Sequence, residues 1–359
     1  MTSDVDATVP AMKLAMSLNY SGDFKADVAR VQDLERAGLD LVWVPEVYTF
    51  DAVSQLGYLA AKTSTIRLGT GIVNVYSRTA TAIAQTAAGL DYVSDGRFVL
   101  GLGASGPQVL EGFHGVPYRH PRSRVIDYIE VCRMVWRREP VVYDGTAVHI
   151  PLPGDQGTGL GKPLKLINRP VRADIPIFWA SLMGRSVADT ARHANGWLPI
   201  FFYPRRADEV WGDDLRAGRA EQAQSLEPLQ ISAGGMLAVG DEYAGARADP
   251  VLDFARPTMA LYIGGMGARG KNFYNTLCQR YGFVDEAIEI QDHYLDGRKD
   301  EAAAAVPTEL LRGTNLVGSR SEVAEMIEAH RAAGVTHLQV IPVTPDPVHE
   351  IENLRTLID

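Results

Sequence analysis

The amino-acid sequence predicts one (β/α)₈ barrel, the TIM-barrel fold of the α/β class, with two insertions. Short runs of aliphatic and β-branched residues alternate with longer amphipathic patterns, which is typical of parallel α/β proteins. About eight such runs occur, and each except the first follows a helical pattern, which favours a barrel over an open doubly wound sheet. The 359 residues suffice for one large domain. We therefore expect a single domain over residues 1–359, with residues 1–10 as a loose arm.

Four strand–helix units fill the first 138 residues. Apolar residues recur at helical spacing over residues 23–37, 78–93 and 122–137, which predicts three helices. Asp51 is expected to cap a further helix, because aspartate there can accept hydrogen bonds from the first helical N–H groups. The strands are expected at Met12–Leu18, Leu39–Val44, Ile66–Val73 and Phe98–Leu102.

Two insertions interrupt this alternation. Residues 140–175, after the fourth helix, are rich in Pro and Gly, and Asp144-Gly145 between two short apolar runs predicts a small hairpin. Residues 244–312, after strand seven, are too long for one crossover, so we expect extra helices over Pro257–Tyr281 and Val284–Leu295. Both insertions are expected near the active-site mouth of the barrel.

The rest of the second half continues the alternation of strand and helix. A capping-box pattern of Ser319 with Glu322 predicts the start of a late helix that ends at Gly334. The Gly-rich run Ile263–Gly267 is expected to be a turn between helices, and the alternative is a hinge or a substrate-side loop. The strands are expected at Ile175–Ala180, Trp197–Phe201, Leu229–Val239 and Leu338–Ile341, with a helix over Arg185–His193 after the first of them.

The composition favours small-molecule chemistry. The formal net charge is −9, so the chain has no overall excess of basic residues to neutralise phosphates, which disfavours nucleic-acid binding. Cys132 and Cys278 lie far apart, and buried free thiols are expected rather than a disulfide or a metal cluster. The N-terminus does not resemble a signal peptide, and no stretch reaches transmembrane length. We therefore expect a cytoplasmic protein without a membrane partner.

Several sequence motifs fail when their context is considered. Residues 101–106 fit G-x-G-x-x-G, but later glycines and prolines predict about fifteen irregular residues where a dinucleotide site needs a helix. Residues 157–162 lack the spacing and the Ser or Thr of a P-loop. Lys162 and Lys165 can still attract an anion, or the run can be a solvated loop. Without metal-ligand spacing among the histidines or a G-x-S-x-G run, metal catalysis and a hydrolase triad are disfavoured.

Active sites of (β/α)₈ barrels lie at the C-terminal ends of the strands, and four runs near these ends carry a family resemblance. The runs are Ala37–Glu46 (AGLDLVWVPE), Arg67–Ile72 (RLGTGI), Ser94–Gly103 (SDGRFVLGLG) and Ala194–Trp197 (ANGW). Together they are similar to the luciferase-like family, and more narrowly to its F420-dependent oxidoreductases of actinobacterial type. The resemblance spans about residues 12 to 345. It implies a barrel that binds a flavin-type cofactor, with the deazaflavin F420 favoured over FMN.

The resemblance implies that residues after the third strand contact the cofactor ring. Relatives have a bulge there, with a non-prolyl cis peptide bond against the ring, and the matching bond is Gly71-Ile72. Glycine lacks a Cβ, so its backbone can approach a flat ring closely. The alternative is an ordinary glycine of a barrel strand. Asn74 matches a position that hydrogen-bonds the ring system.

Glu46 is the best acid–base candidate. It ends the second strand where relatives carry an acidic residue beside the ring, and a carboxylate in a semi-buried mouth can exchange protons near neutral pH. Relatives often have histidine next, whereas this chain has Val47. The alternative is that Glu46 pairs with a neighbouring arginine at the barrel rim. Tyr48 or Tyr76 could then supply the proton, although each can equally be a packing aromatic.

The loops after strands four and five match the side of the family's site that binds the cofactor phosphate. The helix start after strand five independently favours an anion, because free N–H groups and the helix dipole lie there and an arginine adds a full charge. Relatives usually have Gly-Pro where this chain has Met183-Gly184. The residues are Ser105, Gly106, Ser181, Met183, Gly184 and Arg185.

The function that follows is hydride transfer between F420 and a small organic substrate, an alcohol, carbonyl or activated alkene that the sequence does not identify. One alternative is a two-component monooxygenase that uses reduced FMN and oxygen. Another is a non-catalytic flavin-binding protein. The resemblance also implies a homodimer.

Overall fold

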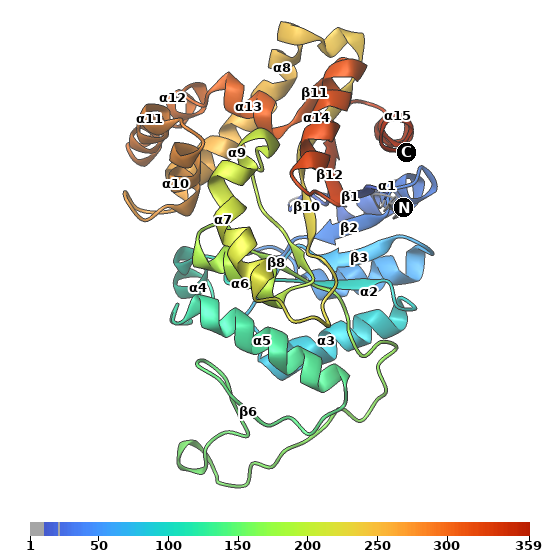
Figure 1. Ribbon diagram of the computed structural model, residues 1–359, viewed down its shortest axis with the longest axis vertical. Coiled ribbons are helices and arrows are strands. Elements are labelled where there is room, and N and C mark those ends of the chain that lie inside the picture. Colours follow the sequence, from blue (N-terminus) through green and yellow to red (C-terminus); the bar gives the residue numbers. More distant parts are fainter. Residues whose placement is uncertain (1–10, 21) are drawn as a thin grey trace, which may run out of the picture.

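The protein is a closed barrel of parallel strands surrounded by helices (Figure 1). The structure, a computed structural model, describes residues 11–20 and 22–359, so the expected N-terminal arm lies outside the described residues. Strand β1 pairs with β2 on one side and β12 on the other, and pairing of β9 with β10 closes the ring. The barrel strands are β1 (Lys13–Ser17), β2 (Leu41–Val44), β3 (Arg67–Thr70) with its continuation β4 (Val73–Asn74), β5 (Phe98–Gly103), β8 (Ile177–Ala180), β9 (Gly196–Trp197), β10 (Gln230–Val239) and β12 (His337–Pro342).

Each strand is followed by a helix, which confirms the predicted fold class. Three predicted helix starts are also confirmed. Asp51 Oδ1 accepts a hydrogen bond from Ser54 N at 2.8 Å, and Ser319 and Glu322 form the capping box. Arg185 begins the helix after β8. The helices around the barrel are α1 (Phe24–Arg36), α2 (Ala52–Lys62), α3 (Ala80–Val93), α5 (Pro121–Trp136), α6 (Arg185–His193), α7 (Ala207–Ala220), α14 (Arg320–Ala332) and α15 (Pro347–Ile358).

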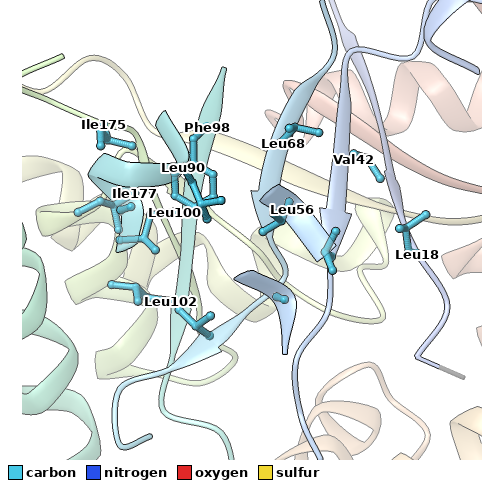
Figure 2. Packing of buried hydrophobic residues seen from close by; sticks show 14 of the residues in the cluster. Leu18, Val42, Leu56, Leu68, Leu90, Phe98, Leu100, Leu102, Ile175 and Ile177 are labelled. Atoms are coloured by element: carbon cyan, nitrogen blue, oxygen red, sulfur yellow. The ribbon is translucent and has the colours of Figure 1, made fainter. Parts of the chain in front are cut away.

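Alternating side chains on the strands build two layers of core. Leu41 and Trp43 of β2 belong to a buried cluster inside the barrel, together with Phe178 of β8. Val42 and Val44 belong instead to the cluster between the strands and helices. This division follows from the two-residue period of a strand. Figure 2 shows part of the second cluster, with Leu18, Val42, Leu56, Leu68, Leu90, Phe98, Leu100, Leu102, Ile175 and Ile177.

Strand six is shorter than predicted. The expected strand Trp197–Phe201 is only Gly196–Trp197 in the structure. Pro199 lacks the N–H that a strand ladder needs, which explains why the chain leaves the sheet there. Phe201 then takes a left-handed backbone conformation, with φ of 52°.

The insertion after β10 is helical, but the expected helix Pro257–Tyr281 is wrong. The chain forms a short helix, then a π-helical turn at Leu261–Gly265, and a second helix only after Asn272. Gly264 and Gly265 lie against Tyr294, and an added Cβ on either would come within 2.4 Å of that side chain. The helices are α8 (Asp249–Leu252), α9 (Arg256–Ala260), α10 (Phe273–Arg280), α11 (Val284–Leu295, as predicted), α12 (Lys299–Ala304) and α13 (Thr308–Thr314), followed by β11 (Leu316–Gly318) beside β10.

A short helix was also missed after β5. Residues 107–112 form α4 (Pro107–Gly112), within the stretch expected to be irregular. Pro107 stands at the first turn, where its missing N–H costs nothing and its fixed φ favours a helix. Short 3₁₀ turns occur at Gly154–Gln156, Pro204–Arg206, Asp241–Tyr243, Gly245–Ala248 and Asp253–Ala255.

The insertion after α5 lies along the outside of the barrel, so its expected place at the mouth is corrected. It contains the predicted hairpin, formed by β6 (Tyr143–Asp144) and β7 (His149–Ile150). Asp127 of α5 accepts hydrogen bonds from the backbone N–H groups of Ala147 and Val148 at 2.6 and 3.1 Å. Because the insertion joins the end of α5 to the start of β8, both of its ends lie opposite the C-terminal ends of the strands.

Both cysteines are free and buried, as predicted. Within residues 11–20 and 22–359, no helix is both long and apolar enough to cross a membrane.

Candidate active site

The predicted site residues lie at one end of the barrel. Glu46 follows β2 by two residues, Gly71 follows β3 directly, and Asn74 ends β4. Since the strands are parallel, their C-terminal ends meet at the same face, here called the mouth. The β2–β4 side of the mouth comprises Glu46, Gly71, Ile72 and Asn74, and the β5–β8 side comprises Ser105, Gly106, Ser181, Met183, Gly184 and Arg185.

Glu46 forms a bidentate ion pair with Arg78. Arg78 Nη1 donates to Oε1 at 2.6 Å and Nη2 donates to Oε2 at 3.0 Å, and the two side chains are 23% (Arg78) and 9% (Glu46) exposed. The N–H of Ala52, at the start of α2, also donates to Oε2 at 2.9 Å. The hydrogen bond to Glu46 raises the pKa of Arg78. The structure thus has the arginine pair that the sequence left open as the alternative to acid–base chemistry.

The backbone after β3 packs tightly against two neighbouring strands. The Gly71-Ile72 peptide bond is cis, as the family resemblance implies. An added Cβ on Gly71 would lie 2.9 Å from Trp43 Cβ, so the missing side chain makes room for Trp43. The close approach of a flat ring to this backbone stays a prediction. The Ile72 side chain lies over β5, where an added Cβ on Gly103 would meet it at 2.4 Å.

Asn74 shapes the loop that carries Arg78. Its side chain is 2% exposed, and Oδ1 accepts hydrogen bonds from the N–H groups of Tyr76 and Ser77 at 3.0 and 2.8 Å. A contact between Asn74 and a ring system stays a prediction. Tyr76 is also engaged, since its hydroxyl donates to the Arg119 carbonyl at 2.8 Å and burial raises its pKa.

The loop after β5 is held by a tyrosine. Ser105 has a left-handed φ of 56°, and its carbonyl accepts a hydrogen bond from the Tyr118 hydroxyl at 3.0 Å. Burial raises the pKa of Tyr118 to about 12, so this donor keeps its proton at neutral pH. Gly106 immediately precedes α4. The Tyr118 side chain, from a later segment of the chain, therefore holds the backbone of this loop in place.

The loop after β8 ends at an uncapped helix. Ser181 Oγ lies 2.7 Å from Thr190 Oγ1, and the Met183 carbonyl accepts a hydrogen bond from Ser186 Oγ at 2.6 Å. Gly184 has a φ of 47° and directly precedes α6, and no side chain among the described residues caps this helix. The N–H groups of Ser186 and Val187 donate to the Met183 and Gly184 carbonyls at 3.2 and 2.9 Å, so it is the dipole of α6 that favours an anion here.

Arg185, the first residue of α6, is exposed beside a cleft between α5, α6 and α7. Its charge adds to that of the helix start. The cleft has a volume of about 190 Å³ and is lined by Arg122, Arg185, Ala188, Asp189, Arg192, Ala217, Gly218 and Glu221. A larger hollow of about 410 Å³ lies on the surface of α11 and holds none of the predicted site residues.

A cluster of aromatic residues at the mouth was missed from the sequence. The hydroxyls of Tyr20 and Tyr262 lie 3.2 Å apart, and the ring of Tyr262 packs edge-on against Tyr274 and Phe201, with centroids 4.8 and 5.3 Å away. Tyr20 follows β1 by three residues and Phe201 follows β9 by four, which brings the cluster to the mouth. Burial raises the pKa of Tyr262, and that of Tyr274 to about 12.

Two signals could have found the missed residues. Tyr20 and Phe201 follow strand ends, where barrel sites lie. Arg78 lies four residues after Asn74, just before the third helix, so a cation was available to Glu46 in a neighbouring loop. By contrast, no local pattern brings Tyr262 and Tyr274 to the mouth, because they belong to the long insertion.

Comparisons with known proteins agree on one family. A family model described as luciferase-like monooxygenase matches residues 8–337. A protein from Mycobacterium tuberculosis, whose name assigns it to the coenzyme F420-dependent oxidoreductases, is 38% identical over 352 residues, which cover 97% of this chain and 99% of the relative. A 5,10-methylenetetrahydromethanopterin reductase from Archaeoglobus fulgidus is 26% identical over 328 residues, 89% of this chain and 90% of the relative.

The fold also matches a solved structure. The coenzyme F420-dependent tetrahydromethanopterin reductase from Methanopyrus kandleri superposes with a TM-score of 0.78 at 20% identity. The match covers 97% of this chain and 98% of that chain, so the two proteins share the barrel over nearly their whole length.

Proposed function

The chain belongs to the luciferase-like monooxygenase family, and we propose that it is a coenzyme F420-dependent oxidoreductase. It transfers a hydride between the deazaflavin and a small organic substrate, an alcohol, a carbonyl compound or an activated alkene. The observation that carries the proposal is the 38% identity, over 97% of this chain, to a relative whose name assigns it to this class. We propose a homodimer as well, as the resemblance implies.

The residues at the mouth fit an anionic cofactor with a flat ring system. The uncapped start of α6 and the exposed Arg185 offer donors and positive charge to a phosphate group. Gly71, Ile72 and Asn74 offer closely packed backbone on the opposite side of the mouth for the ring. When bound, F420 supplies the hydride chemistry, while the protein orients the ring and excludes water.

The proton that accompanies hydride transfer needs a separate donor. Both oxygens of Glu46 already accept hydrogen bonds, so we assign Glu46 to holding Arg78 and the start of α2. Tyr262 suits the proton better, because its hydroxyl lies 3.2 Å from that of Tyr20, which is 52% exposed and connects it to solvent. The Tyr262 Oη proton passes to the substrate oxygen or carbon, and Tyr20 returns a proton from water.

Titration of the purified protein with F420 and with FMN, followed by fluorescence quenching, tests the cofactor. The proposal predicts F420 binding in the micromolar range or tighter and weaker binding of FMN. Tight FMN binding without F420 binding would assign the chain to the FMN-dependent monooxygenases instead. Binding of neither cofactor would overturn the proposal.

A further inference from the structure

Three residues that begin barrel strands point into the end of the barrel opposite the mouth. They are Lys13 of β1, Arg67 of β3 and Gln230 of β10, each the first residue of its strand. Because side chains alternate along a strand, the residue two positions later shows which way each of them points. These later residues are Ala15, Gly69 and Ser232.

All three later residues face the interior of the barrel. Ala15 belongs to the buried cluster inside it. An added Cβ on Gly69 would lie 2.3 Å from the ring of Trp43, and Ser232 Oγ accepts a hydrogen bond from Trp43 Nε1 at 3.3 Å. The strands concerned are the first, third and seventh of the barrel, and alternate strands of this fold fill the same interior layer. The three first residues therefore converge in one layer at the N-terminal end.

A buried histidine adjoins this layer. His337, the first residue of β12, is in register with Lys13 and is 1% exposed. Its ring packs edge-on against Phe178 of the interior cluster, with centroids 5.8 Å apart, so it also lies inside the barrel. Burial, together with the charges of Arg67 and Lys13, lowers the pKa of His337 to about 3, so the ring is neutral at pH 7. Lys13, Arg67, Gln230 and His337 are here called the floor.

The floor contains polar atoms without partners. Nε2 of His337 and Oε1 of Gln230 are buried and have no hydrogen-bond partner among the described residues. Within the same residues, the partly buried Arg67 side chain has no ion pair and donates no hydrogen bond. Buried polar groups of native proteins are nearly always hydrogen-bonded. We therefore expect a group from outside the chain to complete the floor.

The charges of the floor favour an anion as this group. Neither Lys13 nor Arg67 has an acidic partner in the described part of the chain, and Asp40, which also acts on Arg67, is itself paired with Arg355. Burial and the neighbouring Arg172 guanidinium lower the pKa of Arg67, so positive charges meet here. A water molecule can satisfy hydrogen bonds but leaves the buried charge of Arg67 uncompensated, whereas an anion does both.

A tetrahedral oxyanion suits the donors of the floor. The guanidinium of Arg67 offers paired N–H groups that match phosphate geometry, and Lys13, which is exposed, opens the site to solvent. Neutral His337 can donate as well. The Thr336 hydroxyl lies 3.0 Å from its Nδ1, and when that hydroxyl donates, the ring proton is on Nε2. We propose that the floor binds phosphate, as the free ion or as the end of a phosphomonoester, at a site separate from the mouth.

Thermal melting in phosphate and in chloride buffers of equal ionic strength tests the proposal. Phosphate should stabilise the wild type with an apparent dissociation constant of about 1 mM or lower. Arg67→Met keeps a long unbranched side chain but removes the charge, so it should raise this constant about tenfold or more. In chloride the same variant should melt at or above the wild-type temperature, because a buried charge without a partner is lost. A purely structural role of Arg67 would instead lower the melting temperature in both buffers, which would overturn the site.

Two controls separate the floor from the mouth. Arg185→Met changes the start of α6, at the opposite end of the barrel, and should keep the full response to phosphate. Arg67→Met should bind F420 as tightly as the wild type, so the floor and the proposed function can fail independently.

Calorimetric titration of the wild type distinguishes the two sources of phosphate. Binding of glycerol 3-phosphate at least as tight as that of inorganic phosphate assigns the phosphomonoester, and tighter binding of inorganic phosphate assigns the free ion. Absence of binding by both, an equal response of Arg67→Met and the wild type, or loss of the response in Arg185→Met would each overturn the site.

Discussion

The two sides of the mouth differ in how many of their polar and charged side chains are already hydrogen-bonded or paired within the protein. On the β2–β4 side, both oxygens of Glu46 and the side-chain oxygen of Asn74 accept hydrogen bonds from neighbouring residues. On the β5–β8 side, α6 begins without a side-chain cap, and Arg185 is exposed beside a cleft. The polar side chains of the first side, here called the wall, are therefore held by hydrogen bonds within the protein, whereas the second side presents the dipole of α6 and the charge of Arg185 to an anion.

A residue that follows a strand end in this barrel is therefore not necessarily a ligand-binding residue. Glu46 and Arg185 both follow a strand end, yet Glu46 is paired with Arg78, whereas Arg185 forms no ion pair within the part of the chain that the structure describes. Substitutions on the wall should act mainly on stability. Substitutions at the start of α6 should act mainly on cofactor affinity.

The largest effect is expected at Gly71. Gly71→Ala places a Cβ 2.9 Å from Trp43 Cβ, too close for two carbon atoms, so we expect the free energy of unfolding in urea to fall by about 3 kcal/mol. Gly57→Ala is the matched control, because an added Cβ there meets nothing within 4 Å. This control lies within α2 and should raise stability by up to about 1 kcal/mol. Equal stability of the two variants would show that Gly71 does not support the wall.

The Glu46–Arg78 pair should contribute less. Glu46→Gln removes a charged acceptor from Arg78, which is only 23% exposed, so the free energy of unfolding should fall by about 2 kcal/mol. A double-mutant cycle with Arg78→Gln should give a coupling free energy of about 1 kcal/mol or more. The affinity for F420 should stay close to that of the wild type.

Glu46→Gln and a second variant, Tyr262→Phe, distinguish the two candidate proton donors, Glu46 and Tyr262. A screen of ketones, enones and alcohols, followed by the absorbance of F420, provides a turnover assay. Tyr262→Phe removes only the hydroxyl and should lose turnover, whereas Glu46→Gln should retain it. If Glu46→Gln unfolds like the wild type but loses turnover, Glu46 is the acid or base and its assignment to the wall is wrong.

The fold was predictable because its signals are local and periodic. The capping box at Ser319 needs only four consecutive residues, and the eight strand runs repeat along the chain. The predictions that failed depended on contacts with residues far away in the sequence. The predicted helix Pro257–Tyr281 breaks where Tyr294 crosses Gly264 and Gly265, and nothing near these glycines in sequence reveals that crossing.

The sequence predicted where the site residues lie in the barrel, but not which side chains they contact. Placement at strand ends follows from barrel topology, so the mouth was found without the structure. The partner of Glu46 is 32 residues away, and only the folded loop after β4 brings Arg78 to it in bidentate geometry. The expected place of the insertion 140–175 was wrong for a similar reason, because the sequence predicts its small hairpin but not the contact of that hairpin with α5.

The F420 affinity of Arg185→Ala tests most directly whether the start of α6 is the anion-binding part of the mouth. Loss of one charge-assisted contact from an exposed arginine should raise the dissociation constant about tenfold, or about 1.4 kcal/mol. Arg192→Ala is the matched control in the same helix, because Arg192 pairs with Glu221 at 2.8 Å. The account predicts weaker F420 binding for Arg185→Ala alone, with both variants as stable as the wild type. Unchanged affinity in Arg185→Ala, or an equal loss in Arg192→Ala, would contradict it.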